Sequence, residues 1–220
     1  MDIAQLYQLY TDSTGVSTDT RNIDQGNIFF ALKGPSFNAN EFAANALALG
    51  ASAVVVDQRP HYVESDKRYF FVQDVLLALQ KLANYHRRQL DIPILAITGT
   101  NGKTTTKELT KLVLDTKYRT HATVGNLNNH IGVPLTLLGM GPTTEIGIVE
   151  MGANKIGDIR ELCAIAEPSH GLITNIGKAH LEGFGGFDGV LRAKTELYQY
   201  LIQTGGTVFI NAQNPALANM

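Results

Sequence analysis

Apolar residues recur along this chain at spacings that predict short helices and strands. Near the start they follow the i, i+3, i+4, i+7 pattern of one helix face, at Ile3, Leu6, Tyr7 and Tyr10. Compact apolar runs predict strands at 27–32, 53–56 and 69–72, and the Ala- and Leu-rich segment 40–49 predicts a helix. Asp74 is a candidate N-cap for another helix, whose apolar face would carry Val75, Leu76, Leu79 and Leu82.

The second half of the chain alternates strands with helices more regularly. The sequence Asp91-Ile92-Pro93 interrupts the pattern, so we expect a domain boundary there. Beyond it, strands are expected at 94–97, 145–149, 171–174 and 207–210, with helices at 103–115, 155–166 and 188–201. This alternation predicts a parallel sheet covered on both faces. The predicted fold class is therefore α/β, with a small domain over 1–90 and a second domain over 91–220.

Composition narrows the class of protein. The 220 residues carry 18 basic and 20 acidic side chains, a formal net charge of −2, so these totals favour no nucleic-acid-binding surface. The beginning of the chain lacks the pattern of a secretory signal, and no apolar run approaches the roughly 18–20 residues that span a bilayer. A single cysteine, Cys163, excludes an internal disulfide and fits a reducing compartment. We expect a cytoplasmic protein without membrane insertion, with Cys163 in the core.

A glycine-rich turn between a predicted strand and a predicted helix indicates phosphate binding. Backbone N–H groups of such a turn can surround phosphate oxygens, and the helix N-terminus favours negative charge. The general pattern would place its first glycine at 97, where this chain has Ile97, so the loop is a shorter variant. Lys103 would reach the β- and γ-phosphates and the Thr104 hydroxyl would bind Mg²⁺. The candidate nucleotide contacts are Gly99, Thr100, Asn101, Gly102, Lys103, Thr104 and Thr105.

Three further residues are candidates for a functional role, but each also has an ordinary structural explanation. Glu150 ends an apolar strand, where a carboxylate can face a bound Mg²⁺ or simply be solvated. His180 lies in a loop, where a single histidine is more often structural than a ligand. Lys194 lies in a predicted helix, where most lysines are solvated. The amide-rich stretch 123–136 and the polar segment 17–21 can bind a sugar or diphosphate, or be ordinary turns.

Taken together, these segments resemble the Mur ligase family, whose members use ATP to join amino acids to a UDP-linked peptidoglycan precursor. The resemblance rests on five motifs in family order: STDTR at 17–21, TGTNGKT at 98–104, GNLNNHIGVPLTLL at 125–138, EMGAN at 150–154 and AHLEGFG at 179–185. Within the family, the amide-rich stretch is similar to that of ligases that add D-Ala-D-Ala to UDP-N-acetylmuramoyl-tripeptide through an acyl phosphate.

The resemblance implies roles for individual residues. Domain 1–90 would anchor the UDP-sugar, with Thr18, Asp19, Thr20 and Arg21 as contacts, and 91–220 would bind ATP. Asn129 and Asn154 would contact the substrate. Two Mg²⁺ ions would be held by Thr104, Glu150, His180 and a Lys194 carbamylated by CO₂. The catalytic residues implied are Lys103, His180 and Lys194.

Length sets a limit on this interpretation. The family has a longer central domain and a C-terminal domain that brings the amine substrate. We therefore expect the ATP-binding domain to be truncated, the C-terminal domain to be absent and the 220-residue chain alone to be inactive. Three alternatives stay open. The chain can be a UDP-sugar- and ATP-binding module without ligase activity, a related ligase for a different amino acid, or a P-loop kinase or regulator.

Overall fold

The computed structural model describes residues 2–177, 184–214 and 217. The chain forms two compact units, Met1–His86 and Arg87–Met220, and the division falls within helix α3 (Val75–Leu90). Both units are built on a parallel sheet, which confirms the predicted α/β fold class. No helix in the described residues is both long enough and apolar enough to cross a bilayer.

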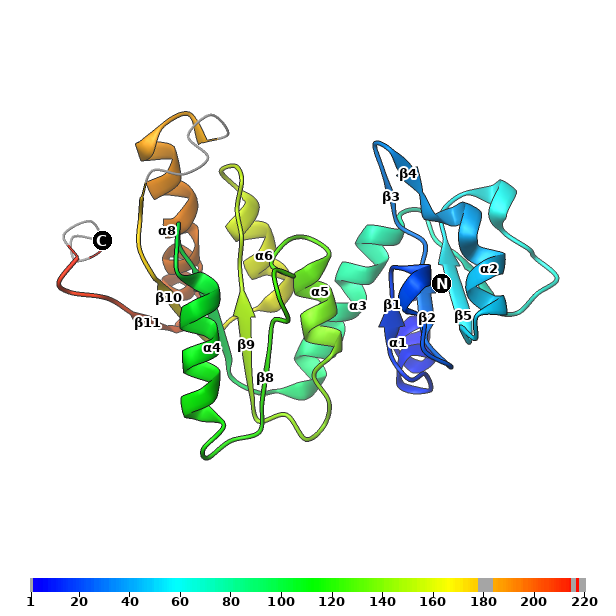
Figure 1. Ribbon diagram of the computed structural model, residues 1–220, viewed down its shortest axis with the longest axis horizontal. Helices are drawn as coiled ribbons and strands as arrows, with labels where there is room; N and C mark the ends of the chain where they lie inside the picture. Colours follow the sequence, from blue (N-terminus) through cyan, green and yellow to red (C-terminus); the bar gives the residue numbers. More distant parts are fainter. Residues whose placement is uncertain (1, 178–183, 215–216, 218–220) are drawn as a thin grey trace. The chain divides into compact units, whose positions relative to one another are not determined.

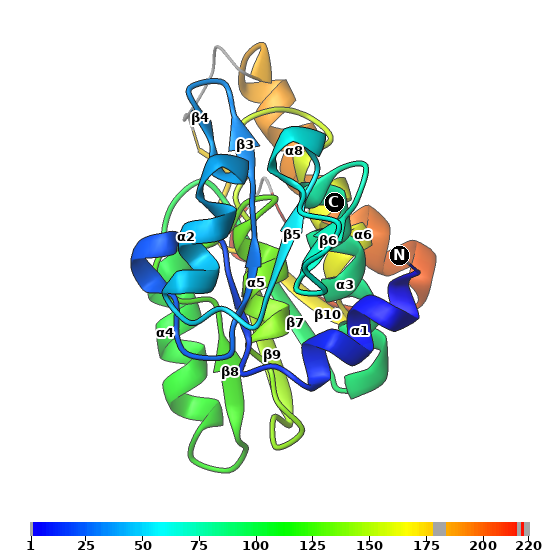
Figure 2. The same ribbon diagram turned by 90° about the vertical axis from the view of Figure 1, so that its right-hand side faces the viewer.

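The first unit is built on a four-stranded sheet. Its strand order is β1-β2-β5-β6 and all neighbours are parallel; the strands are β1 (Val16–Ser17), β2 (Ile28–Phe30), β5 (Ala53–Val56) and β6 (Tyr69–Phe71). Figure 2 shows β5 and β6 side by side. A small antiparallel hairpin joins β3 (Lys33–Gly34) to β4 (Phe37–Asn38). The helices are α1 (Ile3–Thr11), α2 (Ala43–Ala48) and three 3₁₀ turns at Thr20–Asn22, Ala39–Phe42 and Arg59–His61.

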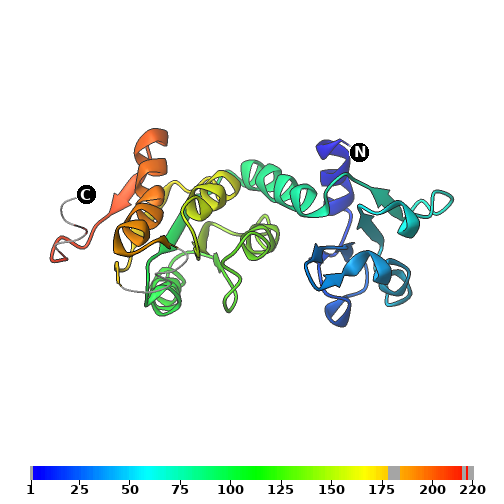
Figure 3. The same ribbon diagram turned by 90° about the horizontal axis from the view of Figure 1, so that it is seen from above.

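The second unit is built on a five-stranded parallel sheet in the order β11-β10-β7-β9-β8. The strands are β7 (Ile94–Thr98), β8 (Thr120–Ala122), β9 (Ile146–Glu150), β10 (His170–Ile173) and β11 (Thr207–Phe209). The helices are α4 (Lys103–Leu114), α5 (Gly132–Leu138), α6 (Asp158–Ala166) and α8 (Phe187–Thr204). Helix α4 lies on one face of the sheet and α6 and α8 lie on the other (Figure 3). Because all five strands are parallel, the loops after them meet at one edge (Figure 1).

Several elements differ from the expected pattern. Strands β1 and β8 and helix α5 were not predicted from the sequence. Helix α5 contains Pro134 in its first turn, where proline costs no helical hydrogen bond. The helix expected from 155 begins only at Asp158, because Gly157 adopts a left-handed φ of 99° immediately before it. The helix expected from 40 begins as a 3₁₀ turn and becomes α-helical at Ala43.

Two local predictions are confirmed. Asp74 Oδ1 accepts a hydrogen bond of 2.8 Å from the backbone N–H of Leu77, which is the expected N-cap contact at the start of α3. Cys163 is fully buried on α6, and burial raises the pKa of its thiol to about 12. The thiol is therefore protonated at neutral pH and serves as a core residue.

Candidate functional site

The glycine-rich turn lies between β7 and α4, and its backbone requires glycine. Gly99 has a φ of 144°, and a Cβ atom there would lie 2.0 Å from Thr174 Oγ1. Gly102 has a φ of 75° and is the N-cap of α4. These conformations are costly for residues with a side chain. The turn therefore directs the N-terminus of a 12-residue helix at the open edge of the sheet, where an anion would be stabilised.

The segment that follows β10 supports this turn. The amide of Thr100 donates to the carbonyl of Asn175 at 3.0 Å, and the amide of Asn101 donates to Asn175 Oδ1 at 3.1 Å. Thr174 Oγ1 donates to the carbonyl of Asn101 at 2.6 Å. Lys103 Nζ donates to the carbonyl of Gly99 at 3.0 Å, so its ammonium group lies at the turn where phosphates would bind.

Glu150 ends β9 beside the first turn of α4, and its side chain is almost fully buried, with the residue 1% exposed. Oε2 accepts a hydrogen bond of 2.9 Å from Thr104 Oγ1, and Oε1 accepts one of 2.8 Å from Asn128 Nδ2. Glu150 is therefore not a solvated residue at a strand end. A carboxylate and a hydroxyl at a phosphate loop form a donor set of the kind that Mg²⁺ prefers.

Two residues that were not among the predicted site residues support the backbone of Glu150, Thr123 directly and Lys107 through Thr123. The amide of Glu150 donates to Thr123 Oγ1 at 2.9 Å. Lys107, on α4, has no exposed surface, and its Nζ donates to the carbonyl of Thr123 at 2.6 Å and forms an ion pair of 2.9 Å with Glu108. The only signal in the sequence was the position of Lys107 four residues after Lys103, which is shared by most solvated helix lysines.

Lys194 lies on α8 and is 3% exposed, so it is not a solvated lysine. Burial, and then the charge of Lys103, lower the pKa of its ammonium to about 8, against weaker opposite effects of Asp158 and Glu196. Lys194 lines a cavity of about 170 Å³ together with Gly99, Lys103, Asn128 and Asn154. The structure therefore brings the phosphate loop, an amide pair and a lysine of low pKa to one cavity.

Asn129 and Thr105, which were also predicted for this unit, do not line the cavity. Asn129 is exposed, and its Oδ1 accepts hydrogen bonds from the amides of Ile131 and Gly132 at 3.1 and 2.9 Å, at the start of α5. Its neighbour Asn128 is the amide that contacts Glu150. Thr105 is exposed on α4. His180 lies outside the described residues.

In the first unit, the predicted segment 18–21 follows β1. Asp19 accepts hydrogen bonds from the backbone amide of Arg21 at 3.0 Å and from its guanidinium at 2.7 Å. Bonding to Arg21 lowers the pKa of the Asp19 carboxyl to about 2. Thr18 precedes Asp19, Thr20 lies between Asp19 and Arg21, and both threonines are half-buried. The segment thus holds an ionised carboxylate and an exposed guanidinium at the carboxyl end of a strand.

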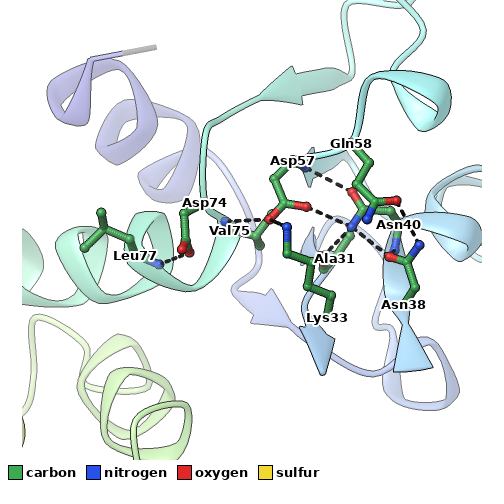
Figure 4. A network of polar contacts seen from close by, with 9 residues as sticks. All are labelled: Ala31, Lys33, Asn38, Asn40, Asp57, Gln58, Asp74, Val75 and Leu77. Atoms are coloured by element: carbon green, nitrogen blue, oxygen red, sulfur yellow. Dashed lines mark hydrogen bonds and ion pairs between the residues drawn. The ribbon is translucent and has the colours of Figure 1, made fainter. Parts of the chain in front are cut away.

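A second polar cluster of this unit is centred on Asn40 (Figure 4). Asn40 is 1% exposed; its Nδ2 donates to Asp57 Oδ1 at 3.0 Å, and its Oδ1 accepts from the amide of Asp57 at 3.0 Å. Asp57 also forms an ion pair of 3.0 Å with Lys33 and accepts from the amide of Val75. The cluster joins the β3–β4 hairpin to the end of β5 and the start of α3.

Two protein-family profiles match most of the chain. The family profile described as "Mur ligase middle domain" matches residues 97–220, and the one described as "Mur ligase family, catalytic domain" matches residues 12–87. This chain belongs to the Mur ligase family. It is 40% identical over 205 residues to a UDP-N-acetylmuramoyl-tripeptide–D-alanyl-D-alanine ligase of Bacillus subtilis and 42% identical over 199 residues to the Escherichia coli enzyme of that name.

Solved structures of Mur ligases have the same fold as this chain. A crystal structure of MurF from Acinetobacter baumannii matches 96% of this chain with a TM-score of 0.84 at 35% identity. MurF from Thermotoga maritima, solved in complex with ADP, matches 87% of the chain with a TM-score of 0.77 at 33% identity. The chain spans less than half the length of these relatives: 45% of the B. subtilis enzyme, 43% of the E. coli enzyme and 49% of the A. baumannii structure.

Proposed function

We propose that this chain is the nucleotide- and UDP-sugar-binding part of an ATP-dependent ligase that joins D-Ala-D-Ala to UDP-N-acetylmuramoyl-tripeptide. The observation that carries the proposal is the position of buried Glu150 between Thr104 and Asn128, at the mouth of a phosphate loop. Relatives that are 40% and 42% identical to this chain over 93% and 90% of its length bear the name of this activity. Because the proposed reaction consumes ATP and a UDP-linked precursor, we propose that it takes place in the cytoplasm.

In the proposed reaction, an oxygen of the peptide's terminal carboxylate attacks the γ-phosphorus of ATP and ADP leaves. The amine of D-Ala-D-Ala then attacks the carbonyl carbon of the acyl phosphate, and inorganic phosphate leaves with that oxygen as the amide forms. Lys103 would move from the carbonyl of Gly99 to the β- and γ-phosphates. Positioning and neutralisation of charge would supply most of the rate enhancement.

The donor atoms present fit a magnesium ion beside the nucleotide. Thr104 Oγ1 and Glu150 Oε2 are 2.9 Å apart, and both are hard oxygen ligands. Magnesium bound there would neutralise charge on the transferring phosphoryl group. Asn128 would hold the other oxygen of Glu150 in place. His180 stays a proposed ligand of a second ion on the basis of the family resemblance alone.

Carbamylation of Lys194 is part of the proposal. A neutral amine attacks CO₂ through its nitrogen lone pair and loses a proton, which leaves a carbamate of charge −1. The low pKa of Lys194, about 8, makes the neutral amine more available than in an ordinary lysine. Its place on the cavity that Gly99 and Lys103 line supports a role beside the phosphates. The carbamate would supply oxygen ligands where a bare ammonium group would repel a cation.

Each of the two units would bind a different substrate. We assign the UDP-sugar to the first unit, residues 1–90, where Thr18, Asp19, Thr20 and Arg21 offer hydroxyls and a guanidinium for a diphosphate. We assign ATP to residues 91–220, and the peptide to Asn129 and Asn154, the second of which lines the cavity.

Phosphate release by the complete gene product tests the function. Release should require UDP-N-acetylmuramoyl-tripeptide and D-Ala-D-Ala together, and Lys194→Ala should abolish it. Phosphate release that ignores both compounds would favour a P-loop ATPase or regulator. Activity with a diamino acid in place of D-Ala-D-Ala would favour a related ligase. Binding of both nucleotides without release under any condition would favour a module without ligase activity.

A further inference from the structure

Three side chains outside the phosphate loop meet between helices α5 and α6. Asp158 and Glu161 lie in the first turn of α6, and His130 lies just before α5. His130 Nε2 and Glu161 Oε2 are 3.1 Å apart. One nitrogen or oxygen from each of the three side chains lies within 4.8 Å of the other two.

Asp158 supplies a second, independent observation. The residue is 4% exposed, and its Oδ2 accepts hydrogen bonds from the amides of Asn154 at 2.8 Å and Lys155 at 3.1 Å. Its Oδ1 is buried and has no hydrogen-bond partner within the part of the chain that the structure describes. A buried carboxylate oxygen without a donor is unfavourable, and a cation would compensate it.

The chemistry of the donors selects the kind of cation. One imidazole nitrogen and two carboxylate oxygens suit Zn²⁺ and similar transition ions, whereas Mg²⁺ strongly prefers oxygen. Bonds of about 2.0–2.2 Å to a common ion would draw the three atoms slightly closer together. Glu161 can make that movement because its side chain is 60% exposed.

We propose that His130, Asp158 and Glu161 bind a divalent transition ion of the Zn²⁺ class, at a site separate from Thr104 and Glu150. The ion would fix the end of the loop that carries Asn128 and Asn129 to the start of α6. On the α6 side, Asp158 already orders the backbone of Asn154. The site would therefore control the geometry of two loops beside the cavity. None of the three ligands is among the residues assigned to the ligase reaction, although Asp158 also acts electrostatically on Lys194.

Calorimetric titration of the protein with ZnCl₂, in excess Mg²⁺ and without nucleotide, tests the proposal. Excess Mg²⁺ competes for oxygen sites such as Thr104 and Glu150, and no phosphate is present to chelate Zn²⁺. Glu161→Gln and His130→Ala should each weaken Zn²⁺ binding by at least about tenfold. Both side chains are substantially exposed, so the variants should fold. Glu145→Gln and His61→Ala are matched controls that should leave the affinity unchanged.

Anomalous diffraction at the zinc edge locates the ion directly. The proposal predicts a peak about 2.0–2.1 Å from His130 Nε2, with oxygens of Asp158 and Glu161 as further ligands. A peak found only elsewhere overturns it. So does Zn²⁺ binding that neither variant weakens, and so does the absence of Zn²⁺ binding to the unaltered protein.

Discussion

Thr104 Oγ1 donates a hydrogen bond of 2.9 Å to Glu150 Oε2, which joins the first turn of α4 to the end of β9. The contact matters because it brings a hydroxyl from the phosphate loop to a carboxylate from another strand. Both residues offer oxygen atoms, which are the ligands that Mg²⁺ prefers. The parallel sheet supplies the arrangement, since β7 and β9 are neighbours and end at the same edge.

Replacing Glu150 by glutamine removes its charge while nearly keeping its shape. We expect ADP binding by Glu150→Gln to lose most of its enhancement by Mg²⁺, because the carboxylate ligand is gone. Calorimetry with and without Mg²⁺ measures the effect. Glu145→Gln, just before the other end of the same strand, should behave like the unaltered protein. An unchanged Mg²⁺ dependence in Glu150→Gln would count against the assignment.

A substitution of Gly99 tests whether stability and ADP binding need the backbone conformation that glycine allows in the loop. Gly99→Ala places a methyl group 2.0 Å from Thr174 Oγ1 at a φ of 144°. We expect the free energy of unfolding to fall by about 1–3 kcal/mol and ADP binding to weaken. Urea denaturation and calorimetry measure the two effects. Gly141→Ala is the control, since its Cβ would meet open space. Equal behaviour of the two variants would show that the loop tolerates a side chain.

Lys107 is predicted to stabilise the loop behind Glu150. In Lys107→Met, the carbonyl of Thr123 loses its 2.6 Å donor inside the protein. We expect the free energy of unfolding to fall by about 1–3 kcal/mol, because a buried acceptor is left without a partner. Lys117→Met, at an exposed position just after the same helix, should change it little. If Lys107→Met is as stable as Lys117→Met, this lysine has no such role.

Lys194 gives a prediction about pH. Its folded pKa of about 8 lies below the ordinary 10.5, so between these values the unfolded chain binds more protons and stability rises with pH. Between a pH below 8 and a pH above 10.5, the free energy of unfolding of the unaltered protein should rise by about 3 kcal/mol relative to that of Lys194→Met. Urea denaturation in CO₂-free buffer measures the difference. A difference that stays flat across this range would mean that the ammonium is not destabilised by burial.

Elements with their own apolar pattern could be predicted from the sequence. Strand β5, four valine and alanine residues, and helix α3, with a periodic apolar face, are examples. Strand β1 has only two residues, and β8 (Thr120-His121-Ala122) lacks the apolar run that marks the equally short β2 (Ile28-Phe29-Phe30). Helix α5 begins with Gly-Val-Pro, a composition that is more typical of a turn.

The site was predictable where chemistry follows local sequence. The Gly-Lys-Thr sequence predicted that Lys103 and Thr104 lie at a turn between a strand and a helix, and the structure has them there. The strand end made Glu150 a candidate ligand, and the family resemblance favoured that role over a solvated residue. Asn129 was predicted as a substrate contact, and the contact of its neighbour Asn128 with Glu150 was not predicted, because it depends on how the loop returns to β9, which local sequence does not encode. Burial of Lys107 likewise depends on the loop that packs over it.

Transfer of oxygen from substrate to phosphate shows whether the ligase reaction passes through an acyl phosphate. The complete gene product would be supplied with ATP, D-Ala-D-Ala and UDP-N-acetylmuramoyl-tripeptide whose terminal carboxylate carries ¹⁸O. An acyl phosphate intermediate predicts one ¹⁸O atom in each inorganic phosphate released, measured by mass spectrometry alongside the new amide. Unlabelled phosphate released while the amide forms, or phosphate released without any amide, would contradict the account.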